Sequence, residues 1–343
     1  MTLSVRLGWG GTQRAAAAAM LLCGLSGCTG SPLASPDISS TPVATPIVVN
    51  STPASATPTP PRGEDPKTAE TRRKAVRAII EKARAAYPGH TAVIFSDLDK
   101  DTRVEFEPEA RFESASLVKL PILAELYRQF EMGEHTPEET LVLLESQKKG
   151  GSGKLKDAPE GSQHTLAALG EAMVTESDNT ATQMLTDLLS KEKVQTGATA
   201  MGMKGTTVQR DIFDFEAIDA GKDNYITAKD AALFLEQLAR QELPGSPAMS
   251  EILERQKRKD MIGKGFPAEV RVAHKTGELD GILHDAGIVY APRGNFILVC
   301  LSDQVSDKEA AKKVWSAMAS DLLKLYSQPA TPATPTPSPS SAS

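Results

Sequence analysis

The segment Ser116-Leu117-Val118-Lys119 places a hydroxyl and an amine three residues apart at the start of a predicted helix. Side chains at this spacing lie on one helical face, about one turn apart. Lys119 can accept or relay the serine proton if its amine is neutral, which requires its pKa to fall by about three units from its usual value of about 10.4. Two further S-x-x-K matches, Ser146–Lys149 and Ser190–Lys193, are interpreted as solvent-exposed. The pattern alone therefore identifies no function.

Two more short motifs follow along the chain. Ser177-Asp178-Asn179 precedes a predicted helix, and its ordinary explanation is helix capping. Lys275-Thr276-Gly277 stands at the end of a predicted strand, where a lysine entering a turn is equally ordinary. Taken together and in this order, the three motifs indicate one site with a nucleophile, two amines, a second hydroxyl and a carboxamide.

The sequence around the motifs predicts a mixed α+β fold. Strands are expected at both ends of the region, with a block of helical periodicity between them. This order predicts an antiparallel sheet formed from both ends of the domain and packed with helices, plus a mainly helical lobe. The expected helices are 67–86, 117–132, 166–174, 180–189, 228–240, 248–257 and 308–325, and the expected strands are 91–97, 103–106, 270–274, 284–290 and 295–302.

The three motifs resemble those of the class A β-lactamases and the penicillin-recognising serine hydrolases around them, whose S-x-x-K, S-D-N and K-T-G set uses these residue types. The likeness covers roughly residues 72–326. It extends to Gly151-Ser-Gly-Lys-Leu-Lys-Asp157, to Glu176-Ser-Asp-Asn-Thr-Ala-Thr182 and to His284-Asp-Ala-Gly-Ile-Val289. The resemblance implies a serine β-lactamase/transpeptidase-like fold.

The resemblance also implies a role for each motif residue. Ser116 would be the nucleophile that forms an acyl-enzyme, and Lys119 its base or proton relay. Ser177 would pass a proton to the leaving nitrogen, while Asn179 would orient substrate and Lys119. The residues expected to bind the substrate and its oxyanion, the latter through the backbone N–H groups of Ser116 and Glu278, are Asn179, Lys275, Thr276, Gly277 and Glu278.

One element of the family is missing from the sequence. Class A enzymes carry E-x-x-L-N on a loop between the second and third motifs, and its Glu activates the water that frees the acyl-enzyme. The corresponding stretch here is Arg210-Asp-Ile-Phe-Asp-Phe-Glu-Ala-Ile-Asp-Ala220, in which Glu216 and Asp214 are the candidate stand-ins. Either carboxylate has an alternative explanation as an ion-pair partner of Arg210 or Lys222. Glu278, beside the expected carboxylate site, is expected to repel anionic penicillins and to offset part of the charge of Lys275.

Composition and motif searches exclude several other classes. With 40% hydrophobic residues the chain can form a large core, and its net charge of −6 with 5% aromatic residues argues against nucleic-acid binding. There is no G-x-S-x-G elbow, no phosphate-binding loop and no zinc-type histidine spacing, so neither a metal nor another cofactor is expected. His274 and His284 are interpreted as hydrogen-bonded structural groups, and Cys300 as a core residue of a strand.

The first residues have the pattern of an export signal. Arg6 and Arg14 precede an apolar run that ends in Leu25-Ser-Gly-Cys28, which resembles a bacterial lipobox. We expect residues 1–28 to be a signal peptide with lipidation at Cys28, an ordinary signal peptide cleaved nearby being the alternative. Residues 29–64 are predicted to be a Ser/Thr/Pro-rich disordered tether, 65–326 the catalytic domain and 327–343 a similar disordered tail.

The sequence therefore predicts an exported serine hydrolase of class A β-lactamase type, lipid-anchored on the outer face of the cytoplasmic membrane or in the periplasm, that opens β-lactam rings through a Ser116 acyl-enzyme. Two alternatives stay open: a related D,D-peptidase or esterase, and a slowly deacylating penicillin-binding or sensor lipoprotein. Expected partners are a β-lactam or cell-wall peptide and, through the lipid anchor, a membrane. The protein is expected to be a monomer.

Overall fold

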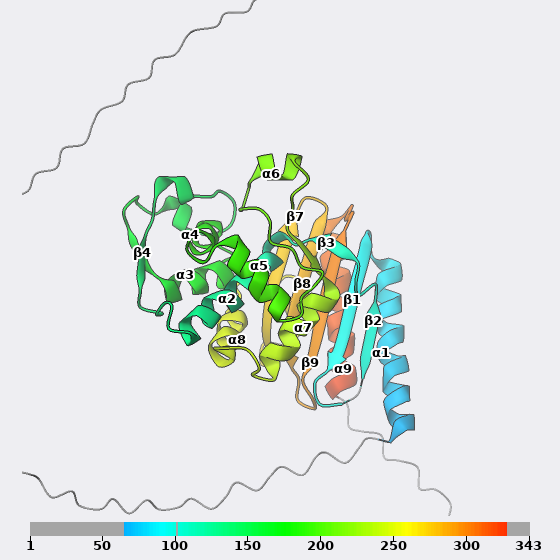
Figure 1. Cartoon of the computed structure of the whole chain (residues 1–343). Coiled ribbons are helices and arrows are strands. Elements are labelled where there is room, and N and C mark those ends of the chain that lie inside the picture. Colours follow the sequence, from blue (N-terminus) through cyan, green and yellow to red (C-terminus); the bar gives the residue numbers. More distant parts are fainter. Residues whose placement is uncertain (1–64, 101, 328–343) are drawn as a thin grey trace, which may run out of the picture. The chain divides into compact units, whose positions relative to one another are not determined.

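The computed structural model describes residues 65–100 and 102–327 (Figure 1). The predicted signal peptide with its lipobox, the tether over 29–64 and all of the tail beyond Ser327 lie outside the described residues. Ser327 itself is the last residue of a helix rather than the first of the tail. Among the described helices, none combines the length and apolarity needed to cross a membrane.

The centre of the fold is a five-stranded antiparallel sheet with the strand order β2-β1-β9-β8-β7. Strands from the two ends of the domain lie side by side in it, because β1 pairs with β9 along its full length. This confirms the predicted α+β fold class. The strands are β1 (His90–Asp97), β2 (Arg103–Phe106), β7 (Arg271–Leu279), β8 (Ile282–Tyr290) and β9 (Phe296–Asp303).

Both faces of this sheet are buried, which explains the nearly continuous apolar runs of its strands. Alternate residues of β9 point to opposite faces: Phe296, Leu298 and Cys300 enter one cluster, whereas Ile297 and Val299 enter the other. Helices α1 (Pro66–Ala86) and α9 (Lys308–Ser327) cover the first face (Figure 1). Cys300 is buried there, as expected, and burial raises the pKa of its thiol.

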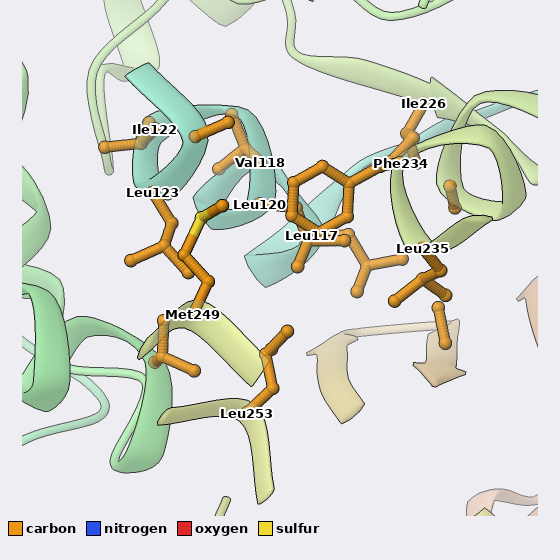
Figure 2. Close-up of a cluster of buried hydrophobic side chains, with 14 of the residues drawn as sticks. Leu117, Val118, Leu120, Ile122, Leu123, Ile226, Phe234, Leu235, Met249 and Leu253 are labelled. Carbon is orange, nitrogen blue, oxygen red and sulfur yellow. The ribbon is translucent and has the colours of Figure 1, made fainter. Parts of the chain in front are cut away.

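Helices of the lobe pack against the other face through the larger cluster. Figure 2 shows Leu117 and Leu120 among side chains of α7 and α8, including Phe234 and Met249. The helices of this region are α2 (Lys119–Glu131), α3 (Leu166–Thr175), α4 (Asn179–Leu189), α5 (Lys191–Ala200), α7 (Ala228–Ala239) and α8 (Ser246–Glu254). Burial of these side chains stabilises the lobe by about 1.5–3 kcal/mol for each large one.

The structure differs from the expected elements at several short segments. The helix expected over 117–132 begins as a 3₁₀ turn, η1 (Ala115–Val118), before α2, and the third motif lies inside β7 rather than at a strand end. Helix α5 was not predicted. Nor were the short elements α6 (Phe215–Asp219), β3 (Arg111–Glu113), β4 (Thr140–Val142), β5 (Gln163–Thr165), β6 (Tyr225–Thr227), η2 (Glu145–Gln147), η3 (Leu155–Asp157) and η4 (Ile262–Gly265).

Candidate active site

Side chains of the three motifs meet at the hydroxyl of Ser177. Lys119 Nζ, at the start of α2, lies 3.0 Å from Ser177 Oγ, and Lys275 Nζ, on β7, lies 3.1 Å from the same atom. The three residues come from the helical lobe, from the loop before α4 and from the sheet. The structure therefore brings the three motifs together, as predicted, and it does so at the junction of lobe and sheet.

Ser116 lies in the 3₁₀ turn η1, partly buried, beside strand β7. Its neighbour Ala115 has a φ of +45°, a conformation that L residues adopt at a cost. The backbone of Gly277 approaches this turn closely: a Cβ on Gly277 would lie 3.2 Å from Ala115 Cβ and 3.3 Å from the Ser116 nitrogen. The glycine of the third motif thus lets β7 lie against the backbone of Ser116.

Lys119 is fully buried and surrounded by oxygen acceptors. Its Nζ lies 2.6 Å from Ser177 O, 3.0 Å from Ser177 Oγ and 2.9 Å from Asn179 Oδ1. Burial, and then repulsion from Lys275, hold the pKa of Lys119 well below its usual value. This is the direction that a proton-accepting role requires. No hydrogen bond joins Ser116 Oγ to Lys119 in the described part of the chain.

The second motif is held in place by its middle residue. Asp178 is buried; its Oδ1 accepts from the Ala181 N–H at 2.9 Å and caps α4, while its Oδ2 accepts from the N–H groups of Lys154 and Leu155. The expected capping and the expected site are thus two functions of one motif. Ser177 has a φ of +55°, so the site is built on a strained backbone.

Asn179 links Lys119 to the facing loop. Its Oδ1 accepts from Lys119, and its Nδ2 donates to Gly150 O at 2.9 Å. The amide is thus hydrogen-bonded to Lys119, as the role that the resemblance implies would require, and it joins Lys119 to the glycine-rich segment over 150–153.

Lys275 is as deeply buried as Lys119. It donates to Ser177 Oγ and, at 2.8 Å, to Thr276 O. Burial, and then the nearby Arg258 guanidinium, lower the pKa of Lys275 to about 7. Its ammonium form is therefore present in only part of the physiological pH range. Thr276 lies next to it on β7 and is buried too.

Glu278 does not offset Lys275 as predicted. Its carboxylate pairs with Arg258 at 2.9 Å and with Lys308 at 3.3 Å, and Lys312 lies 3.7 Å away. The reason is the alternation of side chains along β7, which sends residues three apart to opposite faces. The negative charge of Glu278 is thereby compensated by cations of α9 and of the segment after α8.

Within residues 65–100 and 102–327, the two candidate carboxylates of the loop over 210–223 make no hydrogen bond or ion pair with the motif residues. Asp214 Oδ1 accepts from the Ala217 N–H and caps α6, whereas Glu216 is exposed. Among residues 65–100 and 102–327, neither pairs with Arg210 or with Lys222. Arg210 instead binds Asp223 at 2.6 Å and Glu113 at 3.1 Å. The ion-pair explanation of these carboxylates is therefore wrong. Their assignment as a water-activating base stays a prediction.

The two histidines beside the third motif are structural groups, as expected. His274 Nδ1 lies 2.8 Å from Asp285 Oδ1 with both groups buried. His284 Nδ1 accepts from the Ser302 N–H, so its Nε2 donates to Glu113 O at 2.9 Å, and burial lowers the pKa of His284 to about 4. Within residues 65–100 and 102–327, no cluster of His, Cys, Asp or Glu has the arrangement of a metal site.

This fold and this gathering of motifs define the class of serine β-lactamases and penicillin-recognising hydrolases. A family model described as the β-lactamase enzyme family matches residues 71–326, and the chain belongs to that family. By family and fold it is a serine β-lactamase-like hydrolase. No curated protein matches the chain.

Solved structures agree with this assignment. A β-lactamase from Sphaerobacter thermophilus is 27% identical, with a TM-score of 0.66 over 73% of this chain and 96% of that one. PBP-A is 21% identical, with a TM-score of 0.65 over 78% of this chain and 97% of that one. The extended spectrum β-lactamase TLA-1 is 15% identical, with a TM-score of 0.68 over 74% and 98% of the two chains. The last two show the fold alone.

Two residues near the site were missed by the sequence analysis. Arg258 follows α8 in an irregular segment, and only the structure places it between Glu278 and Lys275. Phe213 lies in the loop over 210–223, and its ring reaches Gly151 beside Asn179. For Phe213, the only indication in the sequence was the presence of an aromatic residue in a loop that lacks E-x-x-L-N.

Proposed function

We propose that the protein is an active-site serine hydrolase of class A type that opens β-lactam rings through an acyl-enzyme on Ser116. The observation that carries the proposal is the convergence of Lys119 and Lys275 on Ser177 Oγ, with Ser116 one turn before Lys119. This arrangement supplies what acyl transfer needs: a nucleophile, a path for its proton and a cation for the substrate carboxylate.

The proposed acylation runs as follows. Ser116 Oγ attacks the lactam carbonyl carbon and gives its proton to the neutral Lys119 amine. The backbone N–H groups of Ser116 and Glu278 stabilise the oxyanion. The C–N bond then breaks, Ser177 donates its hydroxyl proton to the leaving nitrogen, and Lys119 returns a proton to Ser177 at 3.0 Å. Lys275 and Thr276 hold the substrate carboxylate.

Release of the acyl group needs a water and a base. Glu216 is proposed as that base, with Asp214 as the other candidate. A positioned base contributes roughly 10²–10⁴ in rate. Because Asp214 caps α6 and Glu216 is exposed, a second function is supported as well: a penicillin-binding protein that acylates and then turns over slowly. A solved mutant of PBP-A with this fold is an acyl-enzyme complex with penicillin G.

Intact mass followed over time after addition of penicillin G tests the proposal, with Ser116→Ala as the control. An adduct that forms on the wild type and clears within seconds to minutes supports a β-lactamase. A persistent adduct supports the slow binder, and no adduct overturns both. If Glu216→Gln and Asp214→Asn leave the clearing rate unchanged, neither carboxylate is the base. Turnover of D-Ala-D-Ala peptides or esters without a penicillin adduct would identify the peptidase or esterase.

We also propose that the protein is exported and lipid-anchored through Cys28, on the motif Leu25-Ser-Gly-Cys28 alone. Palmitate labelling in cells is expected for the wild type and not for Cys28→Ala. Label that survives in Cys28→Ala would overturn the anchor and leave the enzymatic proposal untouched.

A further inference from the structure

Among the non-glycine residues of 65–100 and 102–327 that have a positive φ, Phe213 is the one aromatic residue. Its backbone adopts a φ of +58°, a region that bulky residues avoid, and its side chain is 39% exposed. Core packing therefore does not explain why the strained conformation is kept. A residue held in strain without burial is a candidate for a binding role.

The ring of Phe213 lies at the edge of the site. A Cβ placed on Gly151 would be 3.3 Å from Phe213 Cζ and 3.0 Å from Asn179 Nδ2. The ring edge and the Asn179 amide therefore flank the same point above Gly151, and Asn179 in turn binds Lys119. Residues 150, 151 and 153 are glycines, so this segment presents no side chain at these three positions.

The loop fixes Phe213 from both sides. Before it, Arg210 is bound to Asp223 and Glu113, and Ile212 packs on the core of the lobe. After it, Asp214 caps α6. The chain thus turns Ile212 inward and Phe213 toward Gly151.

Phe215 extends the apolar surface. Its ring stacks on that of Phe213, with centroids 6.1 Å apart and planes inclined by 27°, and it is 65% exposed. The two stacked rings, of which that of Phe213 lies beside Asn179, form an apolar surface that is open to solvent. Aromatic or other apolar groups gain most from such a surface, since they lose water on both sides of the contact.

We propose that Phe213, backed by Phe215, is the wall of an acyl side-chain subsite and makes the enzyme prefer substrates with an aromatic or large apolar acyl group. The inference rests on the proposed function, because it takes Asn179 to orient the substrate amide. The preference is expected to be about 10- to 100-fold, the fold-change that corresponds to about 1.4–2.8 kcal/mol.

The test compares penicillin G, which carries a benzyl group, with 6-aminopenicillanic acid, which has the same nucleus without it. The measured quantity is the ratio of their second-order rate constants for acylation of Ser116. In Phe213→Ala and Phe213→Gly this ratio is expected to fall at least tenfold, while Phe213→Tyr retains it. Val142→Ala, which removes an exposed apolar side chain on β4, is the matched control and should leave the ratio as it is.

If Phe213→Ala lowers the acylation rate constants of both substrates equally, or lowers neither, the ratio is unchanged and the inference is overturned. Calorimetry of the binding of both ligands to Ser116→Ala tests the proposed subsite independently of the acylation reaction. Suppose that the wild type is never acylated, that Ser116→Ala binds penicillin G more tightly, and that adding Phe213→Ala removes this preference. The proposed subsite is then supported, and the proposed function is overturned. If Ser116→Ala shows no such preference, the proposed subsite is overturned as well.

Discussion

Lys119 and Lys275 share one hydrogen-bond partner: their Nζ atoms lie 3.0 and 3.1 Å from Ser177 Oγ. Both side chains are fully buried, and for both the burial lowers the pKa. Two ammonium groups around one hydroxyl repel each other strongly in such a site. The lowered pKa of Lys119 lets it act as the neutral base, while Lys275, with a pKa of about 7, retains a proton at slightly acidic pH.

The first prediction concerns the alkaline limb of the pH–rate profile of acylation, which is the range where the rate falls as pH rises. Lys275 is protonated below its pKa of about 7 and neutral above it, so its attraction for a substrate carboxylate is present below that pH and lost above it. The second-order rate constant for acylation by a carboxylate-bearing β-lactam should fall about tenfold per pH unit above 7. Lys275→Arg keeps its charge at all these pH values and should remove the limb. A limb that persists in Lys275→Arg belongs to another group.

Arg258 provides the second prediction. Its guanidinium is the second cause of the lowered pKa of Lys275, after burial. Arg258→Gln should therefore shift the alkaline limb to higher pH, by a few tenths of a unit to about one unit. Arg255→Gln is the matched control, because Arg255 lies three residues earlier and pairs with Glu171 instead. The same shift in both variants, or none in Arg258→Gln, would contradict the prediction.

The sequence predicted the sheet well because both of its faces are buried. Apolar runs such as Asn295–Ser302 have one structural explanation, and β9 differs from the prediction by one residue at each end. Helix α5 was missed because its sequence, KEKVQTGATA, buries only Val194 and Ala198. A helix with so few apolar positions has little periodicity to read.

The site was predictable where chemistry restricts the residue types and not where contacts cross loops. Ser116, Lys119 and Ser177 stand in motifs whose spacing carries information. The pairing of Glu278 with Arg258 joins β7 to an irregular segment, and nothing in the local sequence of either residue indicates it. Long-range ion pairs of this kind follow from tertiary packing alone.

The third prediction concerns stability. Unfolded Lys275 binds its proton up to a pH of about 10.5, whereas the folded side chain loses it at about 7. Between these pH values, unfolding is accompanied by uptake of a proton at Lys275. The free energy of unfolding therefore rises by about 1.4 kcal/mol for each unit by which pH increases, and it decreases by the same amount as pH falls. At pH 7 the burial costs on the order of 4 kcal/mol.

Lys275→Met should therefore abolish acylation and yet raise the free energy of unfolding at pH 7 by on the order of 2 kcal/mol, after loss of its two hydrogen bonds. At about 1.4 kcal/mol per pH unit the gain should be lost by about pH 8.5, so that at pH 10 the variant is less stable than the wild type. Urea unfolding at both pH values measures it. Lys313→Met, at an exposed lysine of α9, is the control and should change stability equally at the two pH values. A Lys275→Met protein that is less stable at pH 7 would contradict the assigned cost.

The fourth prediction separates backbone strain from steric fit at the second motif. Gly153 has a φ of +98°, and a Cβ there would lie 2.2 Å from Asp178 Cγ. Gly161 has a similar φ of +82° with nothing within 4 Å. Gly161→Ala should therefore cost only the strain of a positive φ, about 1–2 kcal/mol. Gly153→Ala should cost that and at least about 2 kcal/mol more, because Asp178 cannot move without releasing its three backbone N–H groups.

The same displacement should reach the chemistry, since Asp178 stands between Ser177 and Asn179. We expect Gly153→Ala to slow acylation of Ser116 by at least tenfold at temperatures where the protein is still folded, while Gly161→Ala acylates at the wild-type rate. Thermal unfolding and intact-mass kinetics on the same two samples measure both effects. Equal stability of the two variants would show that the loop over 150–157 moves away from Asp178 freely, and that Asp178 does not fix the position of Ser177 and Asn179.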